Sequence, residues 1–167
     1  MIHRSLHTLS VAAVAITFAT VLTRADQVRR QGSAEVPLEV SLKVGGAAYV
    51  AKGQGACTHA RQASIYDVRA EMWSVRQTGE GGSSVELTFW KPSDGSASMF
   101  SLSLNATKSV SISTVKGGQV TGSGSVNLSP SAKGGTFTVD AKTRAGEAVA
   151  GTIKCEAFTP AIAEGGD

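Results

Sequence analysis

The sequence has few of the residue types on which several classes of protein depend. It contains two cysteines, three histidines and four prolines in 167 residues, and 5% of the residues are aromatic. Two cysteines are too few for a multi-disulfide mini-protein or for an all-cysteine zinc site within one chain. Charged residues make up 17% and hydrophobic residues 41%, which argues against both a disordered chain and a polytopic membrane protein. We therefore expect one folded domain.

Residues 1–25 have the layout of a secretory signal peptide. Arg4 supplies a positive charge, Leu9–Leu22 is an uncharged stretch of 14 residues, and Thr23–Ala25 offers a small-x-small cleavage site. A membrane-spanning helix needs about 20 apolar residues, so the stretch is short for the alternative, an uncleaved anchor. We expect export to the periplasm or the medium, with no membrane span after cleavage.

The charge of the mature chain is close to balanced. Arg4 and Arg24 leave with the signal peptide, so 14 basic and 13 acidic residues remain of the 16 and 13 in the full chain. Apart from the pair Arg29–Arg30, the basic residues are scattered. Nucleic-acid binding requires a concentrated basic face, so we expect no nucleic-acid partner.

Cys57 and Cys155 are expected to form a disulfide, because exported thiols are commonly oxidised. Closing a loop of about 100 residues is worth roughly 4–5 kcal/mol in the chain-entropy model. The alternative is two free thiols, one of them reactive.

Period-two alternation of apolar residues predicts strands joined by tight turns. Residues 36–44 and 47–52 flank Gly45–Gly46, a pair that suits a two-residue hairpin. In the last hairpin, a three-residue loop at 144–146 pairs Phe137 with Ile153 and places Cys155 on the core side. Gly117–Gly118 is a further turn signal, and the glycine-rich strand that follows it suits an edge or a bulge.

A central hairpin turns at Pro92–Gly95. If Lys91 opposes Ser96, Phe89 pairs with Ser98 and one face of the hairpin is apolar. Residues 60–75 are less regular, and a helical turn before a strand at 70–77 is compatible with them. We place a flexible N-terminal segment at 26–35, a single domain at 36–158 and a flexible C-terminal tail at 159–167.

About eight or nine strands, antiparallel connections and one disulfide indicate an all-β fold. The architecture is an antiparallel β-sandwich or a small barrel. Trp73 and Trp90 lie between Cys57 and Cys155, which resembles the immunoglobulin pattern. The cysteines are too far apart for a domain of that kind, so the fold is immunoglobulin-like only in outline.

Residues for catalysis or metal binding are sparse. His59 is the single histidine after residue 25, whereas zinc sites use several His or Cys ligands. Cys57 with His59 could form a thiolate–imidazole pair, and His59 with Met72 and Met99 could bind copper. The opposing interpretation is a bridged Cys57, a surface His59 and packed methionines.

Other catalytic arrangements lack a specific signature. Residues 121–125 resemble a G-x-S-x-G elbow without its strand-to-helix turn. Asp67 and Glu71 could serve as paired carboxylates, but no spacing in the sequence fixes their separation. We therefore predict no enzymatic activity, no cofactor and no metal.

Aromatic residues on an exposed face are the strongest candidates for a binding site. Alternation places Trp90 opposite the buried Phe89 and close to Met99, and exposed apolar patches often mark interaction sites. Tyr66, Arg69 and Trp73 belong to types that anchor partners. The opposing interpretation is that Trp73 fills the core and a second sheet covers Trp90.

The resulting hypothesis is an exported, non-catalytic binding or interaction protein. Its ligand site would comprise Trp90, Met99, Tyr66, Arg69 and Trp73, and its partner would be a protein, a small molecule or a glycan. One alternative is a thiol- or copper-dependent protein centred on Cys57 and His59, and another is a structural component of the cell envelope.

The intact mass of the exported protein tests both the cleavage site and the disulfide. We expect a chain that begins near Asp26 and gains two alkyl groups only after reduction. The variant Cys57→Ala/Cys155→Ala should lose about 4 kcal/mol of unfolding free energy. Alkylation of Cys57 without reduction would contradict the disulfide.

Overall fold

The computed structural model describes residues 34–162, and these form an all-β domain. The predicted signal peptide and residues 26–33 lie outside the described residues, as do residues 163–167. The strands are β1 (Glu35–Val44), β2 (Ala47–Ile65), β3 (Val68–Thr78), β4 (Ser84–Pro92), β5 (Met99–Asn105), β6 (Val110–Ser113), β7 (Gly122–Pro130), β8 (Gly135–Thr143), β9 (Ala148–Cys155) and β10 (Thr159–Pro160).

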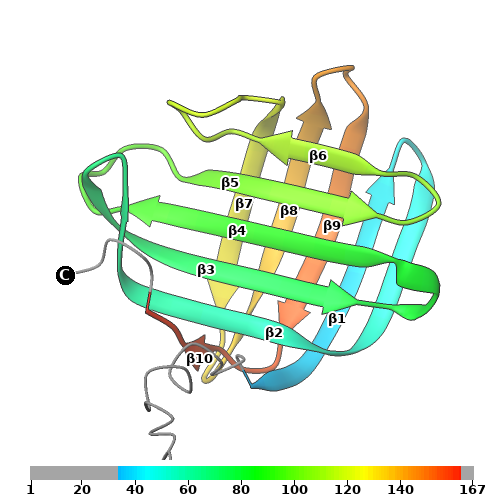
Figure 1. Cartoon of the computed structure of the whole chain (residues 1–167), viewed down its shortest axis with the longest axis horizontal. Coiled ribbons are helices and arrows are strands. Elements are labelled where there is room, and N and C mark those ends of the chain that lie inside the picture. Colours follow the sequence, from blue (N-terminus) through cyan, green and yellow to red (C-terminus); the bar gives the residue numbers. More distant parts are fainter. Residues whose placement is uncertain (1–33, 163–167) are drawn as a thin grey trace, which may run out of the picture. The chain divides into compact units, whose positions relative to one another are not determined.

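Nine strands form one antiparallel sheet that nearly closes into a barrel, in the order β6-β5-β4-β3-β2-β1-β9-β8-β7. The prediction of an antiparallel sandwich or small barrel is confirmed, and the continuous sheet is its barrel form. Figure 1 shows β3–β6 crossing in front of β7–β9. The long strand β2 pairs with β1 through its first half and with β3 through its second half, so it connects the two layers.

The barrel has a seam between β6 and β7. These strands are the two ends of the sheet order, and no ladder joins them within the described residues; Figure 1 shows β6 crossing β7 at a large angle. Gly118 N donates to Val115 O at 3.3 Å, so the turn predicted at Gly117–Gly118 is confirmed, although the strands that flank it do not pair in a ladder in the described part of the chain. Thr121 N donates to Ser113 O at 3.0 Å, and Ser113 N donates to Thr121 Oγ1 at 2.8 Å. The edge position expected for β7 is confirmed.

Two predicted hairpin registers are confirmed and one is wrong. Val44 pairs with Ala47 around the glycine turn, and Phe137 pairs with Ile153. In the central hairpin Phe89 pairs with Phe100 rather than with Ser98. The register moves by two residues, which keeps the same residues on the apolar face.

The shift in the central hairpin follows from a longer loop between β4 and β5. Ser93 N and Oγ both donate to Arg69 O, at 2.8 and 2.9 Å. Ser96 N donates to Asp94 Oδ1 at 2.9 Å. Hydrogen bonds from the side chain and the backbone of Ser96 lower the pKa of Asp94 below its ordinary value. These polar contacts stabilise the loop, and β5 therefore begins only at Met99.

A β-bulge in β2 replaces the helical turn considered for residues 60–75. Ala60 pairs with Met72 and Ala63 pairs with Ala70, so Arg61 and Gln62 together oppose Glu71. A bulge changes the face to which the following residues point. This interruption explains why the sequence of this segment does not show a regular alternation.

The disulfide Cys57–Cys155 joins β2 to β9 with a Cα–Cα distance of 6.2 Å, as predicted. Both cysteines are buried in the barrel interior, among residues that include Leu38, Phe137 and Ile153. The core-side position predicted for Cys155 is therefore correct. The disulfide is compatible with an extracellular protein.

The chain after Cys155 crosses one end of the barrel. Phe158 N donates to Lys133 O at 2.8 Å, and Ala161 N donates to His59 O at 3.1 Å. Thr159–Pro160, assigned above to the C-terminal tail, pairs in parallel with residues 58–59 of β2. No helix within residues 34–162 is long and apolar enough to cross a membrane.

Gly151 provides a test of the contact between β1 and β9. Its φ is +145°, and a Cβ atom there would lie 2.0 Å from Ser41 O. Gly151→Ala should lower the free energy of unfolding by more than about 2 kcal/mol, because strand separation would add to backbone strain. Gly46→Ala is the control: φ is +91° but nothing lies within 4 Å, so we expect a loss of about 1 kcal/mol. Chemical denaturation measures both, and equal losses would contradict the steric argument.

Candidate functional site

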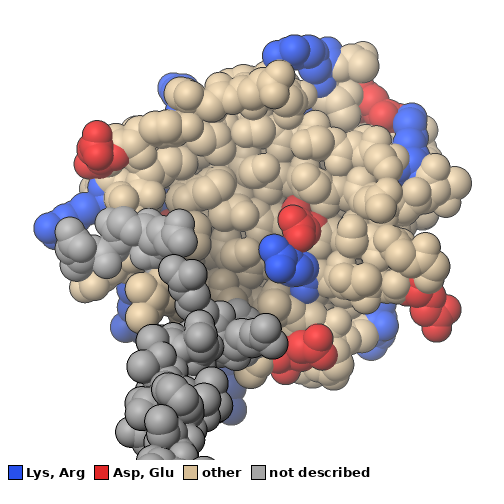
Figure 2. All heavy atoms as spheres, in the orientation of Figure 1, with Lys and Arg blue, Asp and Glu red and all other residues tan. Residues whose placement is uncertain are grey.

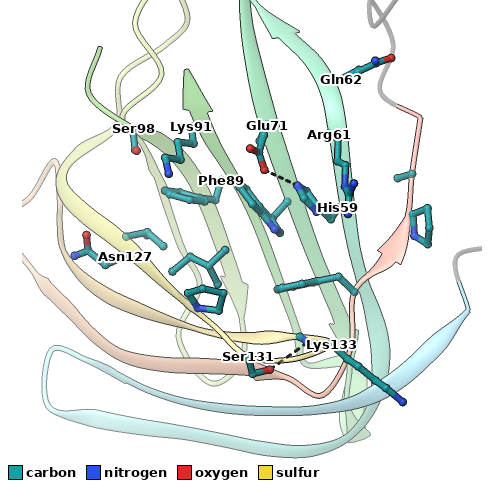
Figure 3. A pocket seen from close by; sticks show the side chains of 18 of the residues that line it. His59, Arg61, Gln62, Glu71, Phe89, Lys91, Ser98, Asn127, Ser131 and Lys133 are labelled. Carbon is teal, nitrogen blue, oxygen red and sulfur yellow. Dashed lines mark hydrogen bonds and ion pairs between the residues drawn. The ribbon is translucent and has the colours of Figure 1, made fainter. Parts of the chain in front are cut away.

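A groove of about 1260 Å³ lies between the second half of β2, with β3 and β4, and the strand β7. The turn between β7 and β8 and the C-terminal segment complete its wall. Figure 3 shows the side chains that line it. The residues that line the groove come from most of the length of the domain, from His59 to Ile162.

The floor of the groove is an aromatic row that crosses three strands. His59 on β2 pairs with Trp73 on β3, which pairs with Phe89 on β4. The imidazole of His59 stacks on the indole of Trp73, with 4.4 Å between the ring centroids and an interplanar angle of 6°. Trp73 is only 7% exposed, so its second face belongs to the core. Phe158 meets His59 edge-on at 6.4 Å.

Glu71 forms an ion pair or hydrogen bond with His59 beside this row. Glu71 Oε2 lies 2.8 Å from His59 Nε2, and the two side chains are 49% and 21% exposed. Figure 3 shows the two side chains directed toward each other from neighbouring strands. The contact fixes the orientation of the imidazole over Trp73 and engages one oxygen of the carboxylate.

Two cations lie on either side of Glu71. Lys91 on β4 is its register partner, and Arg61 opposes it from the bulge in β2. Both side chains extend toward the groove in Figure 3. A third cation, Lys133, belongs to the turn opposite, and the end of its side chain points away from the centre of the groove.

The residues predicted as a ligand site do not come together in one place. Trp90 pairs with Met72 and Met99, and this row faces away from Trp73 because successive residues of a strand point to opposite sides. Tyr66 and Met99 line a separate pocket of about 430 Å³. The five candidates thus divide between the outer face, this small pocket and the groove.

Arg69 and Trp73 have more specific placements. Arg69 is exposed, and its carbonyl accepts the hydrogen bonds from Ser93. Trp73 belongs to the core, and its ring also forms part of the groove floor. Trp90 is half-buried, and Tyr66 is 56% exposed.

The structure does not bring together the residues of the thiol- or copper-dependent site considered for Cys57 and His59. Cys57 is bonded to Cys155, and neither cysteine is free. Met72 pairs with Ala60, the neighbour of His59, so its sulfur and the imidazole lie on opposite faces of the sheet. Within residues 34–162 no group of three His, Cys, Asp or Glu side chains could hold a metal ion.

The outer surface of the front layer differs from the groove. Figure 2 shows a broad uncharged area over this layer, with basic and acidic side chains interspersed and mostly at its margins. Arg76 and Glu86 form one such pair at 2.8 Å. Ion pairs of this kind on an exposed face contribute little to stability.

Sequence reasoning missed Arg61, Lys91 and Phe158 as site residues. Phe158 lies at the predicted end of the domain, and Arg61 lies in the bulge that obscured the alternation. The short element Cys57-Thr58-His59 is the sequence signal closest to the groove, and the sequence indicates Glu71 only as a possible partner of Asp67.

Searches with this chain against protein-family models, curated proteins and solved structures gave no match.

The stacking of His59 on Trp73 can be tested with Trp73 as the reporter. In a Trp90→Phe background, Trp73 is the remaining tryptophan, because the chain has two. His59→Ala should increase acrylamide quenching of Trp73 and lower the free energy of unfolding by about 1 kcal/mol, the value of an aromatic pair. Glu71→Gln retains the imidazole and should leave the quenching nearly unchanged. Equal quenching in all three proteins would contradict the stacked arrangement.

Proposed function

We propose that this protein is exported and acts as a non-catalytic binding protein whose groove holds a small ligand with an apolar part. The observation that supports this proposal is the aromatic row of His59, Trp73 and Phe89 on the floor of a groove of about 1260 Å³. Ligand sites in proteins are concave, mostly apolar and equipped with a few polar groups. The groove is concave, and its walls add numerous polar side chains to this aromatic floor.

Export is proposed from two independent features. Residues 1–25 have the layout of a signal peptide, and the barrel contains a buried disulfide. Disulfides persist in oxidising compartments, which include the bacterial periplasm and the extracellular medium.

The role assigned to the groove is binding, because its polar residues do not make a complete set for catalysis. A nucleophilic mechanism requires a hydroxyl or thiol held by a base. Within residues 34–162 the hydrogen bond of the His59 side chain is to the Glu71 carboxylate, with no hydroxyl or thiol joined to the imidazole, and the nearby Cys57 is in the disulfide. The His59–Glu71 pair serves as a rigid, partly polar wall for a ligand.

The outer row of Met72, Trp90 and Met99 is the second candidate for a binding site. It carries the half-buried Trp90 next to Met72 and Met99. The two candidates differ in which tryptophan would contact the ligand, and this difference gives the experiment.

A brominated ligand discriminates between the two sites, because heavy-atom quenching acts only at short range. The probe is 11-bromoundecan-1-ol, a neutral molecule with an apolar chain. We expect saturable quenching in the Trp90→Phe variant, where Trp73 reports on the groove. We expect little quenching in the Trp73→Phe variant, where Trp90 reports on the outer face. Saturable quenching of Trp90 alone would place the ligand on the outer face.

Truncation of one groove residue provides a second measurement. Phe158→Ala should weaken binding of the probe by about tenfold, because a large aromatic contact is lost. Val50→Ala is the matched control, since Val50 is 73% exposed and lies outside the groove. Absence of saturable binding to either tryptophan in folded protein would overturn the proposed function.

A further inference from the structure

We propose that the ligand of the groove is an amphipathic acid: an apolar chain or ring system that carries a carboxylate, sulfate or phosphate. Arg61 and Lys91 would bind the acidic group. This inference rests on the proposed function and adds the chemical class of the ligand.

The first observation is that no ion pair joins Arg61 or Lys91 to an acidic residue among the residues that the structure describes. Four other basic residues of the domain, Lys52, Arg76, Lys108 and Lys154, each pair with a glutamate. Across residues 34–162, no carboxylate lies within 4.0 Å of a side-chain nitrogen of Arg61 or Lys91. Within this part of the chain, neither charge is neutralised by an ion pair.

The second observation is the arrangement around Glu71. Glu71 is the only acidic residue among the described residues that line the groove, and His59 engages its carboxylate at 2.8 Å. Lys91 faces Glu71 in register from β4, and Arg61 faces it from the bulge in β2. The two cations therefore flank Glu71, whose carboxylate is already hydrogen-bonded to His59.

The third observation is the direction of the side chains. Arg61 and Lys91 both extend toward the groove, and Lys133 points away from its centre. An anion between Arg61 and Lys91 would receive charge-assisted hydrogen bonds, which are stronger than neutral ones. Arg61 can donate two parallel bonds to a carboxylate or phosphate, and Lys91 acts as a point charge.

The apolar part of the ligand has a defined place next to these cations. The row of His59, Trp73 and Phe89 is the adjacent cross-strand row on the same three strands, two residues from the row of Arg61, Glu71 and Lys91. Leu128 on β7 lines the same groove. An acid bound by the cations could therefore place its chain over the aromatic floor.

The experiment compares 11-bromoundecanoic acid with 11-bromoundecan-1-ol, which have the same chain and differ in charge. Affinities are measured at neutral pH and low salt by quenching of Trp73 in the Trp90→Phe background. We expect the acid to bind about tenfold more tightly, as charge-assisted contacts require. Added salt should weaken binding of the acid and leave the alcohol nearly unaffected.

Paired variants identify the cations responsible. Arg61→Gln/Lys91→Gln should abolish the preference for the acid, measured as the ratio of the affinities for acid and alcohol. Lys43→Gln/Lys142→Gln removes the same charge from exposed residues outside the groove and should retain the preference. Dodecyl phosphate and dodecyl sulfate, tested in competition with the acid, distinguish the acidic groups.

The outcomes separate the two proposals. Equal affinity for acid and alcohol overturns the amphipathic-acid inference and leaves the binding function standing. Preference for the acid that persists in Arg61→Gln/Lys91→Gln also overturns the inference, because the anion then binds elsewhere. Failure of both probes to bind overturns the proposed function itself.

Discussion

The disulfide between Cys57 and Cys155 is the constraint on which the groove depends. Residues 58 and 59 of β2 pair with β3 on one side, so the short strand β10 occupies the side that β1 occupies earlier along β2. The covalent bond holds β9 against β2 at the point where β1 begins, and the chain leaving β9 reaches that vacant side within a few residues. Phe158 thereby becomes a wall of the groove instead of a residue in a free terminus. A bond in the core thus determines the shape of a surface feature.

Much of the barrel could be predicted because its hairpins are encoded locally. The turn at Gly45–Gly46 and the pairing of Phe137 with Ile153 follow from alternation and loop length alone. The pairing predicted for Phe89 is wrong because hydrogen bonds from Ser93 Oγ to Arg69 O and from Ser96 N to the Asp94 side chain extend the loop. Such bonds leave no periodic signal in the sequence. The error of two residues preserved the buried face, since both registers satisfy the same apolar pattern.

The candidate site was less predictable because its parts are distant in sequence and because a bulge interrupts one of them. Arg61 opposes Glu71 only because Arg61 and Gln62 together face one residue, and alternation cannot indicate a bulge that reverses it. The sequence analysis places both Trp73 and Trp90 in the ligand site, with a position in the core as the alternative for Trp73; the structure places the two on opposite faces of the sheet. Which face becomes a groove depends on where β7 lies, and that strand is far away in the chain.

The seam between β6 and β7 has a consequence for the width of the groove. Each interior strand is held by two ladders, whereas β7, which borders the groove, pairs only with β8. Bonds between residues 113 and 121 are the main backbone link across the seam. Outward displacement of β7 would thus strain one ladder, that with β8, whereas displacement of β2, β3 or β4 would strain two. The wall formed by β7 would adjust to ligands of different size. The more rigid wall formed by β2, β3 and β4 would select ligands by their charge.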